Sequence, residues 1–331
     1  MKHLRLAIPL LAVLLSLPSR ATEAEFQQLR LTHQHAALEA LAREHLARDA
    51  QDETALWYLG RQAFGEPRLR AELMPRAQAC ARDRPQSARC QHLLGLLIGA
   101  ELMDAGSFAA MRRVGEVKER FERAVALAPH DYAMRRDLQG LYLALPALLG
   151  GGKSKARAQA EAVARVDAPR GLLLQAVLSI ADKAFDPAEQ RLAAVQPGAD
   201  RQLAADLLQT QIDLGRALLD SGAAERARGW LARLQQQGAS SPELHLELGR
   251  ALLALKQPAE AAAAFEQALR INARLRLHHH LAAAFEAAGD VPQAITAYRR
   301  VLADPFNNAA AERANERLKA LQPSQQARRT P

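Results

Sequence analysis

The clearest pattern of apolar and polar positions lies between residues 242 and 305. Apolar residues there recur at the spacing of one face of an amphipathic helix, namely at Leu244, Leu248, Ala251, Leu252 and Leu255. A second stripe follows at Ala261, Phe265, Ala268 and Leu269. The pattern therefore predicts two consecutive helices, each with one apolar face.

The same pattern returns about one repeat length downstream. The first of these later stripes consists of Leu277, Leu281, Ala284, Phe285 and Ala288, and the second of Ala294, Tyr298, Val301 and Leu302. The segment is thus predicted to form two helical hairpins in tandem, each of which buries its stripe against the next hairpin.

These residues resemble the tetratricopeptide repeat, a helix–turn–helix unit of roughly 34 residues. The resemblance lies at packing positions: Leu248, Gly249, Ala261, Phe265, Ala268 and Leu269, then Leu281, Ala282, Gly289, Asp290, Ala294, Tyr298 and Leu302. It implies an all-α fold, a right-handed superhelical solenoid of antiparallel helical hairpins with a concave face. We place the best repeats at 242–274 and 275–307 within a repeat domain at 198–322, and irregular hairpins of the same type at 22–197.

The rest of the chain fits an almost entirely helical protein. Of its 331 residues 49% are apolar and only 4% aromatic, and few segments alternate with the period of two that strands require. We expect helices at 26–50, 54–64, 69–81 and 132–149. A closing helix is expected at 308–321, followed by a disordered basic tail at 323–331.

Two segments interrupt the repeat spacing. Residues 104–116 are longer than a repeat turn, which predicts either a lengthened helix or a protruding loop. Residues 150–154, Gly-Gly-Gly-Lys-Ser, approach a phosphate-binding loop, but Ala147 replaces the first glycine of that motif and the preceding residues read as helix. We interpret them as a turn before a helix at 154–166.

Residues 1–21 have the features of a secretory signal peptide. A short basic start precedes an apolar run at 6–17, and Ser19 and Ala21 occupy the positions that a signal peptidase reads. The run is shorter than the roughly 20 residues of a membrane span, and no cysteine follows it to carry a lipid. We expect cleavage after Ala21 and an exported chain in a bacterial periplasm.

The basic charge of the chain does not indicate a nucleic-acid partner. The formal net charge is +8, and removal of Lys2, Arg5 and Arg20 with the signal peptide gives 8 − 3 = +5. No basic run interleaved with aromatic residues occurs, and an exported protein rarely meets nucleic acid. The remaining charge allows unspecific attraction to acidic envelope components.

Cys80 and Cys90 are the only cysteines. The repeat reading places one near the end of a helix and the other near the start of the next, facing each other across a turn. In an oxidising compartment they are expected to form a disulfide. The alternative is a pair of small buried thiols, and the spacing is not that of a redox-active Cys-x-x-Cys motif.

We nominate no catalytic residue, cofactor or metal ligand. His278, His279 and His280 are consecutive, so on a helix they point about 100° apart and do not converge on one ion. His245 occupies the position of His278 one repeat earlier. We interpret these histidines as polar groove residues with one packed ring. Acidic pairs such as Glu243 and Glu247 have the spacing of ordinary helix surfaces.

In the family that the repeats resemble, the first helix of each hairpin lines a groove that holds a peptide of another protein. The resemblance assigns eight groove positions here: Glu243, Leu246, Arg250, Leu253, Arg276, His279, Ala283 and Glu286. Arg250 and Arg276 would hold a carboxylate or backbone carbonyls.

The sequence as a whole predicts a non-enzymatic scaffold or assembly factor that binds another envelope or periplasmic protein. Three alternatives stay open: a chaperone-like holder of exported unfolded chains, a cell-wall enzyme on a helical scaffold, and a structural subunit of a secretion or transport complex. The sequence names neither the partner nor the oligomeric state.

Overall fold

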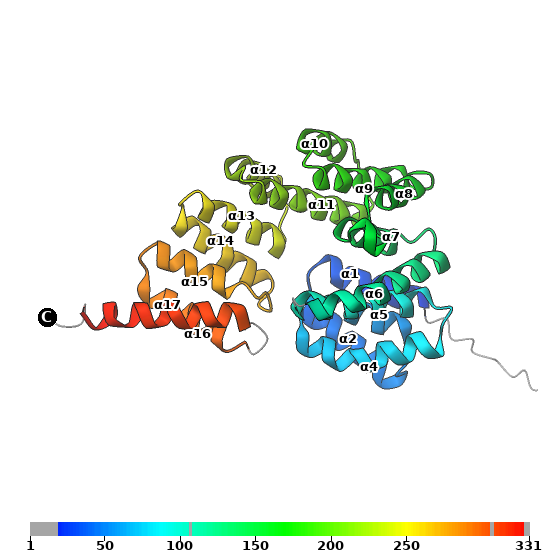
Figure 1. Ribbon diagram of the computed structural model, residues 1–331, viewed down its shortest axis with the longest axis horizontal. Coiled ribbons are helices and arrows are strands. Elements are labelled where there is room, and N and C mark those ends of the chain that lie inside the picture. The colour runs from blue at the N-terminus through cyan, green and yellow to red at the C-terminus, as the bar shows by residue number, and fades with distance from the viewer. Residues whose placement is uncertain (1–18, 106–107, 305–307, 328–331) are drawn as a thin grey trace, which may run out of the picture.

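A computed structural model of the chain describes residues 19–105, 108–304 and 308–327. Within these ranges the regular elements are all helices and no strand occurs. The helices follow one another around an arch, with the N-terminal helices at one end and the C-terminal helix at the other (Figure 1). The predicted all-α solenoid is therefore confirmed, while the apolar run at 6–17 lies outside the described residues.

The helices are short, antiparallel neighbours joined by tight turns. Their bounds are α1 Ser19–Leu31, α2 His35–Arg48, α3 Glu53–Gln62, α4 Pro67–Asp83, α5 Ala88–Ala105, α6 Phe108–Leu127, α7 Tyr132–Ala144, α8 Lys153–Ala164, α9 Ala168–Ala181, α10 Phe185–Ala193, α11 Arg201–Asp220, α12 Ala224–Gln236, α13 Pro242–Ala254, α14 Pro258–Ile271, α15 His278–Ala287, α16 Val291–Leu302 and α17 Asn308–Ala327. Single-turn 3-10 helices occur at Ala63–Gly65 and Ala147–Leu149.

The apolar stripes meet in a core that follows the arch. Its N-terminal part surrounds Leu56, Leu73 and Leu97, and its C-terminal part surrounds Leu244 and Phe265. A smaller cluster, which includes Leu173 and Leu214, lies between them. Each hairpin thus buries its stripe against its neighbours, as expected for a solenoid.

The tandem hairpins α13–α14 and α15–α16 pack as the sequence predicts. Leu244 and Phe265 are fully buried. Gly249 lets the Phe265 ring approach α13, because a methyl group there would lie 2.6 Å from the ring. The pair Gly95 and Phe121 repeats this arrangement in the α5–α6 hairpin, where the same distance is 2.7 Å. The close approach of glycine and aromatic ring is therefore shared by both halves of the arch. Residues 305–307, the end of the second predicted repeat, lie outside the description.

The single helix predicted at 26–50 is wrong, because a turn divides it into α1 and α2. His33 in this turn has a φ of 54°, a left-handed conformation that a right-handed helix cannot contain. The Thr32 hydroxyl donates back to the Gln28 carbonyl at 2.9 Å and closes the end of α1. Apolar residues continue at helical spacing across the turn, so periodicity alone does not reveal it.

Two other helix ends differ from expectation. The helix predicted at 132–149 ends at Ala144, because Pro146 forces Leu145 into an extended conformation with a ψ of 135°. At the C-terminus α17 continues to Ala327, so helix covers the first part of the tail expected to be disordered from 323. The helix continues through Pro323, which is a poor helix former, into the better formers Gln325, Gln326 and Ala327, and residues 328–331 lie outside the description.

The structure also tests the predictions for the two segments that interrupt the repeat spacing and for the two cysteines. The extra residues at 104–116 lengthen α5 and α6 to 18 and 20 residues, with 106–107 outside the description. Cys80 and Cys90 form the expected disulfide between α4 and α5, with their Cα atoms 5.3 Å apart. The glycine-rich segment is a turn, in which Gly150 and Gly152 have φ values of 80° and 116°.

None of the helices in the described ranges has the length and apolar character to cross a membrane.

Candidate functional site

The inner face of the arch contains a cavity of about 1000 Å³. Its wall is made by α1, α2, α3, α7, α9, α11 and the start of α13, so both halves of the arch contribute. The lining includes Arg30, Trp57, Arg61, Tyr132, Arg136 and Asp206. A cavity of this volume lies at the upper end of the range of ligand pockets.

Helix N-termini define one side of the cavity. Asp131 caps α7 by accepting from the Met134 amide at 2.9 Å, and Asp167 caps α9 by accepting from the Arg170 amide at 3.0 Å. Ser241 caps α13 in the same way through the Leu244 amide. These short polar side chains satisfy amides that have no partner inside their helices, and they fix where each helix begins on the cavity wall.

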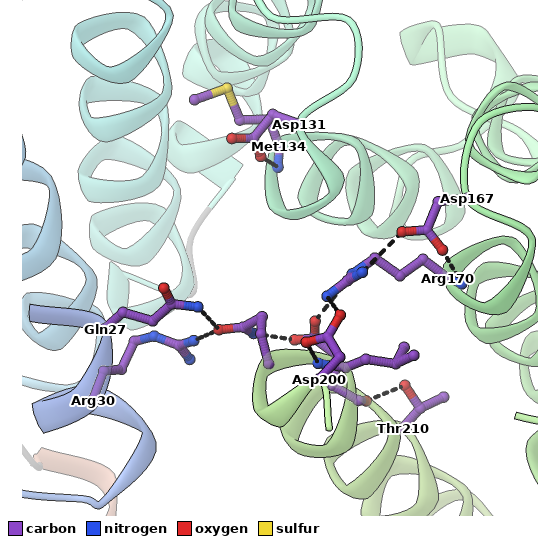
Figure 2. A network of polar contacts seen from close by, with 11 residues as sticks. Gln27, Arg30, Asp131, Met134, Asp167, Arg170, Asp200 and Thr210 are labelled. Carbon is purple, nitrogen blue, oxygen red and sulfur yellow. Dashed lines mark hydrogen bonds and ion pairs between the residues drawn. The ribbon is translucent and has the colours of Figure 1, made fainter. Parts of the chain in front are cut away.

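Arg170 joins α9 to α11. Its guanidinium donates to Asp167 at 2.8 Å and to Asp200 at 3.0 Å, and its Nε lies 3.8 Å from Asp206 Oδ2. Figure 2 shows Arg170 reaching from α9 between Asp167 and Asp200. The guanidinium also lies 5.7 Å from the centre of the Tyr132 ring. Arg170 is therefore already paired within the protein and holds Tyr132 and Asp206 side by side.

A buried chain of polar groups supports the opposite wall. Trp57 Nε1 donates to His92 Nδ1 at 3.1 Å, so His92 carries its proton on Nε2 and donates it to Asp137 at 3.0 Å. Arg61 Nη1 donates to the same carboxylate at 3.3 Å, and Arg61 Cζ lies over the Trp57 ring, 5.0 Å from its centre. Burial alone would raise the pKa of Asp137, but Arg61, the His92 hydrogen bond and Arg136 hold it well below its usual value.

Three arginines of the cavity wall, Arg30, Arg61 and Arg136, differ in their partners. Arg136 Nε lies 3.6 Å from Asp137 Oδ1, and Arg61 and His92 bind the same carboxylate. Burial and the charge of Arg61 lower the pKa of Arg30, which donates to the neutral amide oxygen of Gln202. The acidic groups Asp131, Asp167, Asp206 and Glu243 lie on the same wall, so the cavity presents donors and acceptors together.

Polar contacts close the arch across its inner face. Gln27 and Arg30 of α1 both donate to Gln202 of α11, as Figure 2 shows for the two side chains of α1. We call the following four pairs the cross-face contacts: Gln27 with Gln202, Arg30 with Gln202, Arg201 with Gln28 at 2.6 Å, and Arg274 with Glu39 at 2.6 Å. No apolar cluster of the described residues spans the same gap.

The predicted groove residues occupy different surroundings. Glu243 lines the cavity, whereas Leu246 and Leu253 pack against the C-terminal core. Arg250 is bound to Glu247 at 2.6 Å and to Asp220 at 2.9 Å. Among these four positions on α13, the structure therefore brings one to the cavity, and Arg250 is already engaged with two carboxylates.

The other four predicted positions lie on or next to α15. Arg276 donates to Asp304 at 2.7 Å. Glu286 accepts from the Tyr298 hydroxyl at 2.8 Å and pairs with Arg317. His279 and Ala283 are half-buried. Their role in binding a partner remains a prediction.

Of the three consecutive histidines, His280 packs against an aromatic ring of the core. The His280 ring stacks on Phe265 with 5.6 Å between centres, and burial followed by the charge of His279 lowers the pKa of His280 to about 4. His278 borders a second hollow of about 490 Å³ between α14, α15 and α16. Within the described ranges no group of three or more His, Cys, Asp or Glu residues is placed to hold a metal ion.

Sequence reasoning missed most of the cavity wall. Arg30 of α1, Asp206 of α11 and the α7 pair Tyr132 and Arg136 come from distant parts of the chain and meet only because the arch curves. Local signals exist at Asp131, Asp167 and Asp200, where an acidic residue precedes a helix, but these mark helix starts and do not show that the starts converge.

Comparison with known proteins supports the repeat assignment. Residues 242–274 match the family model described as tetratricopeptide repeat. Yeast Tom70 has a similar fold, with a TM-score of 0.59, 13% identity and coverage of 93% of this chain and 61% of Tom70. A chain from the crystal structure of the APC/C hetero-tetramer Cut9–Hcn1 has a TM-score of 0.49, 16% identity and coverage of 90% and 56%.

A tetratricopeptide repeat protein from Parabacteroides merdae is similar with a TM-score of 0.47 and 11% identity over 80% of this chain and 98% of that one. The present chain thus spans 56% to 61% of the Cut9–Hcn1 and Tom70 chains that it matches. A comparison with curated proteins found no match.

Proposed function

We propose that this chain, a tetratricopeptide-repeat protein, is a non-enzymatic scaffold or assembly factor of the bacterial periplasm that holds an extended segment of a partner protein on its concave face. The observation that carries the proposal is the cavity of about 1000 Å³ at the centre of that face. Helices from both halves of the arch contribute to it, so a bound segment would touch several repeats at once. Such extended inner surfaces are the binding surfaces of solenoid proteins.

Two observations favour export. The N-terminal residues have the order of a secretory signal, with a basic start, an apolar run and a small residue at Ala21. The bond between Cys80 and Cys90 is of a kind that persists in oxidising compartments and is rare in the cytosol. The partner is accordingly another protein of the envelope.

A holder of exported unfolded chains is the second candidate. The mixed donors and acceptors on the cavity wall favour it, because they do not select for one charge. A dedicated scaffold captures one partner, whereas a holder captures many unfolded clients through the same cavity.

The test is a crosslinking pull-down with the mature chain, residues 22–331, from a periplasmic extract of the organism that encodes it. Ala204 is exposed and lines the cavity, so Ala204→Trp should fill space there and reduce capture at least fivefold. Glu225→Trp, at an exposed position of α12 outside the cavity, should leave capture unchanged. Equal loss in both variants, or no loss in either, would refute binding in the cavity.

A further inference from the structure

The loop between α7 and α8 exposes apolar side chains to solvent. Its residues 143–152 read Leu-Ala-Leu-Pro-Ala-Leu-Leu-Gly-Gly-Gly, so the loop has no polar side chain. Leu148 is 96% exposed, the largest fraction among the exposed large apolar side chains of the described residues. Its exposed neighbours are Ala144, Pro146 and Ala147. Single exposed leucines are common on protein surfaces, but a continuous exposed apolar run points to a function. We call residues 143–152 the apolar tip.

The backbone of the apolar tip is closed on itself. The Leu149 and Gly151 amides donate to the Pro146 carbonyl at 3.0 and 3.2 Å. The Gly152 amide donates back to the Tyr142 carbonyl at 2.7 Å, and a proline has no amide to satisfy. Unpaired amides are costly to remove from water, so these internal hydrogen bonds let the tip leave water at a low cost.

Lysines surround the apolar tip. Lys155 Nζ donates to the Gly150 carbonyl at 2.9 Å, and Lys118 Nζ would lie 2.6 Å from a methyl group added to Gly150. Lys153 directly follows the tip, and it is exposed, as is Lys155. A lysine covers apolar surface with its aliphatic stem while its ammonium group stays in polar surroundings. These side chains therefore suit an apolar loop that meets a charged surface.

Positive charge is in excess at the tip. Asp182 pairs with Lys153, and Glu122 accepts at 2.8 Å from the hydroxyl of Tyr142, which precedes the tip. Lys183 follows Asp182 in the chain and is exposed, so the four lysines exceed these two acids by 4 − 2 = +2. Four of the seven lysines of the chain thus gather at one loop. This surface attracts a partner of negative charge.

Two other exposed apolar side chains lie at corresponding places of earlier hairpins. Phe64 is in the turn that follows α3, and Met103 is in the last turn of α5. Arg70 joins the two places, because it donates to the Phe64 carbonyl at 2.9 Å and pairs with Asp104. The turns within successive hairpins of a solenoid lie along one edge. Val166, in the turn between α8 and α9, lies at the other end of its hairpin and thus on the opposite edge.

We propose that the edge carrying the apolar tip binds the surface of a bilayer that contains anionic phospholipids. The tip enters the headgroup region, with Leu148 deepest, and the surrounding lysines bind lipid phosphates. Lysine is a flexible point charge that needs no fixed geometry from its partner, and the tip projects into solvent instead of forming a groove. Both features fit a lipid surface better than a folded protein.

The bilayer contact leaves the cavity accessible. The cavity is lined by the first turns of α7, including Tyr132 and Arg136, and by no residue of the apolar tip. The 13 residues of α7 separate the two places by about 20 Å. The protein can therefore bind a bilayer whatever its cavity holds, and this inference goes beyond the proposed function without resting on it.

The test uses the mature chain, residues 22–331, and sedimentation with vesicles of phosphatidylcholine, with or without phosphatidylglycerol. The parent should bind the vesicles that contain phosphatidylglycerol, and about tenfold more weakly those of phosphatidylcholine alone, because several lysines lose their attraction to anionic lipid. Lys118→Gln combined with Lys155→Gln should weaken binding to the anionic vesicles about tenfold. Arg313→Gln combined with Lys319→Gln is the matched control, because both residues are exposed on α17 away from the tip, and it should bind like the parent.

The apolar contribution is tested at Leu148. Leu148→Asp should weaken binding to the anionic vesicles about tenfold or more, because it removes the inserted side chain and adds a negative charge. Val166→Asp is the matched control, since Val166 is also apolar and 59% exposed but lies on the opposite edge. It should bind like the parent. Both positions are exposed, so both variants should keep the melting temperature of the parent.

Leu148→Trp tests insertion directly. Tryptophan favours the interface of a bilayer, so this variant should keep its binding. Its emission should shift to the blue on anionic vesicles and be quenched by lipids brominated on their acyl chains. The parent, which has Trp57 and Trp230 alone, supplies the baseline and should show neither change.

Three results would each overturn the inference: no binding of the parent to vesicles that contain phosphatidylglycerol, equal binding by Leu148→Asp and Val166→Asp, or no added quenching in Leu148→Trp. In each case the apolar tip would be assigned to a contact with another protein. Ala204→Trp should leave vesicle binding unchanged. A failure of the proposed function, seen as partner capture indifferent to Ala204→Trp, is therefore distinct from a failure of this inference.

Discussion

Arg274, in the turn between α14 and α15, donates to Glu39 of α2 at a distance of 2.6 Å across 235 positions of the chain. The pair joins the C-terminal half of the arch to its N-terminal end. Glu39 also accepts from Arg43 of its own helix at 3.0 Å. Burial would raise the pKa of Glu39, but the two arginines lower it. Polar contacts thus join the two halves of the arch across its inner face, whereas apolar packing holds neighbouring helices together within each half.

The cross-face contacts are expected to control the width of the arch more than its stability. Arg274 and Glu39 are partly exposed, and exposed ion pairs contribute about 0–1 kcal/mol each. We predict that Arg274→Gln combined with Gln202→Ala lowers the free energy of unfolding by less than about 1 kcal/mol and enlarges the radius of gyration. X-ray scattering in solution measures the radius, and urea unfolding measures the stability.

High salt should likewise enlarge the radius of gyration of the unmodified chain, because ionic screening weakens exposed ion pairs. Arg226→Gln is the matched control, since Arg226 pairs with Asp186 and Glu189 of a neighbouring helix and not across the face. An arch of unchanged radius in the double variant would show that the cross-face contacts do not hold it closed.

The buried carboxylate of Asp137 is predicted to make stability depend on acid. Its pKa in the folded chain is below the ordinary value of 3.8, so its contribution is present above that value and is lost as the pH falls through the lower, folded pKa. Asp137→Asn removes the negative charge shared by Arg61, Arg136 and His92 and should cost about 3 kcal/mol at pH 7. Urea unfolding at pH 7 and pH 3 should show a smaller difference between variant and parent at pH 3; an equal difference would contradict the assignment.

The Cys80–Cys90 bond should stabilise the α4–α5 turn. Closing a loop of this length contributes about 3 kcal/mol in the chain-entropy model. We predict that the oxidised mature chain has no alkylatable thiol, and that reduction lowers its free energy of unfolding by that order. Mass spectrometry after alkylation without reductant measures the thiols. Two alkylated cysteines in protein purified from the periplasm would contradict the prediction.

Gly249 is predicted to be intolerant of any side chain. A methyl group there would lie 2.6 Å from the Phe265 ring, and overpacking of this kind costs about 1–3 kcal/mol. Gly229→Ala on α12 is the matched control, because no atom lies within 4 Å of the added methyl group, and alanine is the better helix former. Urea unfolding should show that Gly249→Ala is destabilised and Gly229→Ala is not; equal stability of the two variants would refute the packing argument.

The sequence predicted the fold well and the site poorly. The reason is the same for both: the spacing of residues along the chain reflects contacts between neighbouring helices and not contacts between distant ones. Neighbouring helices contact each other through residues at a fixed spacing in the sequence. The apolar stripes of α13 to α16 and the pair Leu248 and Gly249 are such residues, so they could be predicted. The turn at His33 interrupts no stripe, so it was missed. Tyr132 and Asp206 come together through the curvature of several hairpins, and no spacing of residues in the sequence indicates that curvature. Glu243 was assigned from its groove position in the repeat, and it lines the cavity because the start of α13 borders it.

The most direct measurement is site-specific photo-crosslinking of the mature chain in the periplasm, with a photoreactive amino acid at Ala133 on the cavity wall or at the exposed position Glu225 on α12. If the concave cavity holds a partner segment, Ala133 gives crosslinked partner peptides that are absent from Glu225 and are lost with Ala204→Trp. If both positions give the same products, or Ala133 gives none, the cavity is not where this protein binds its partner.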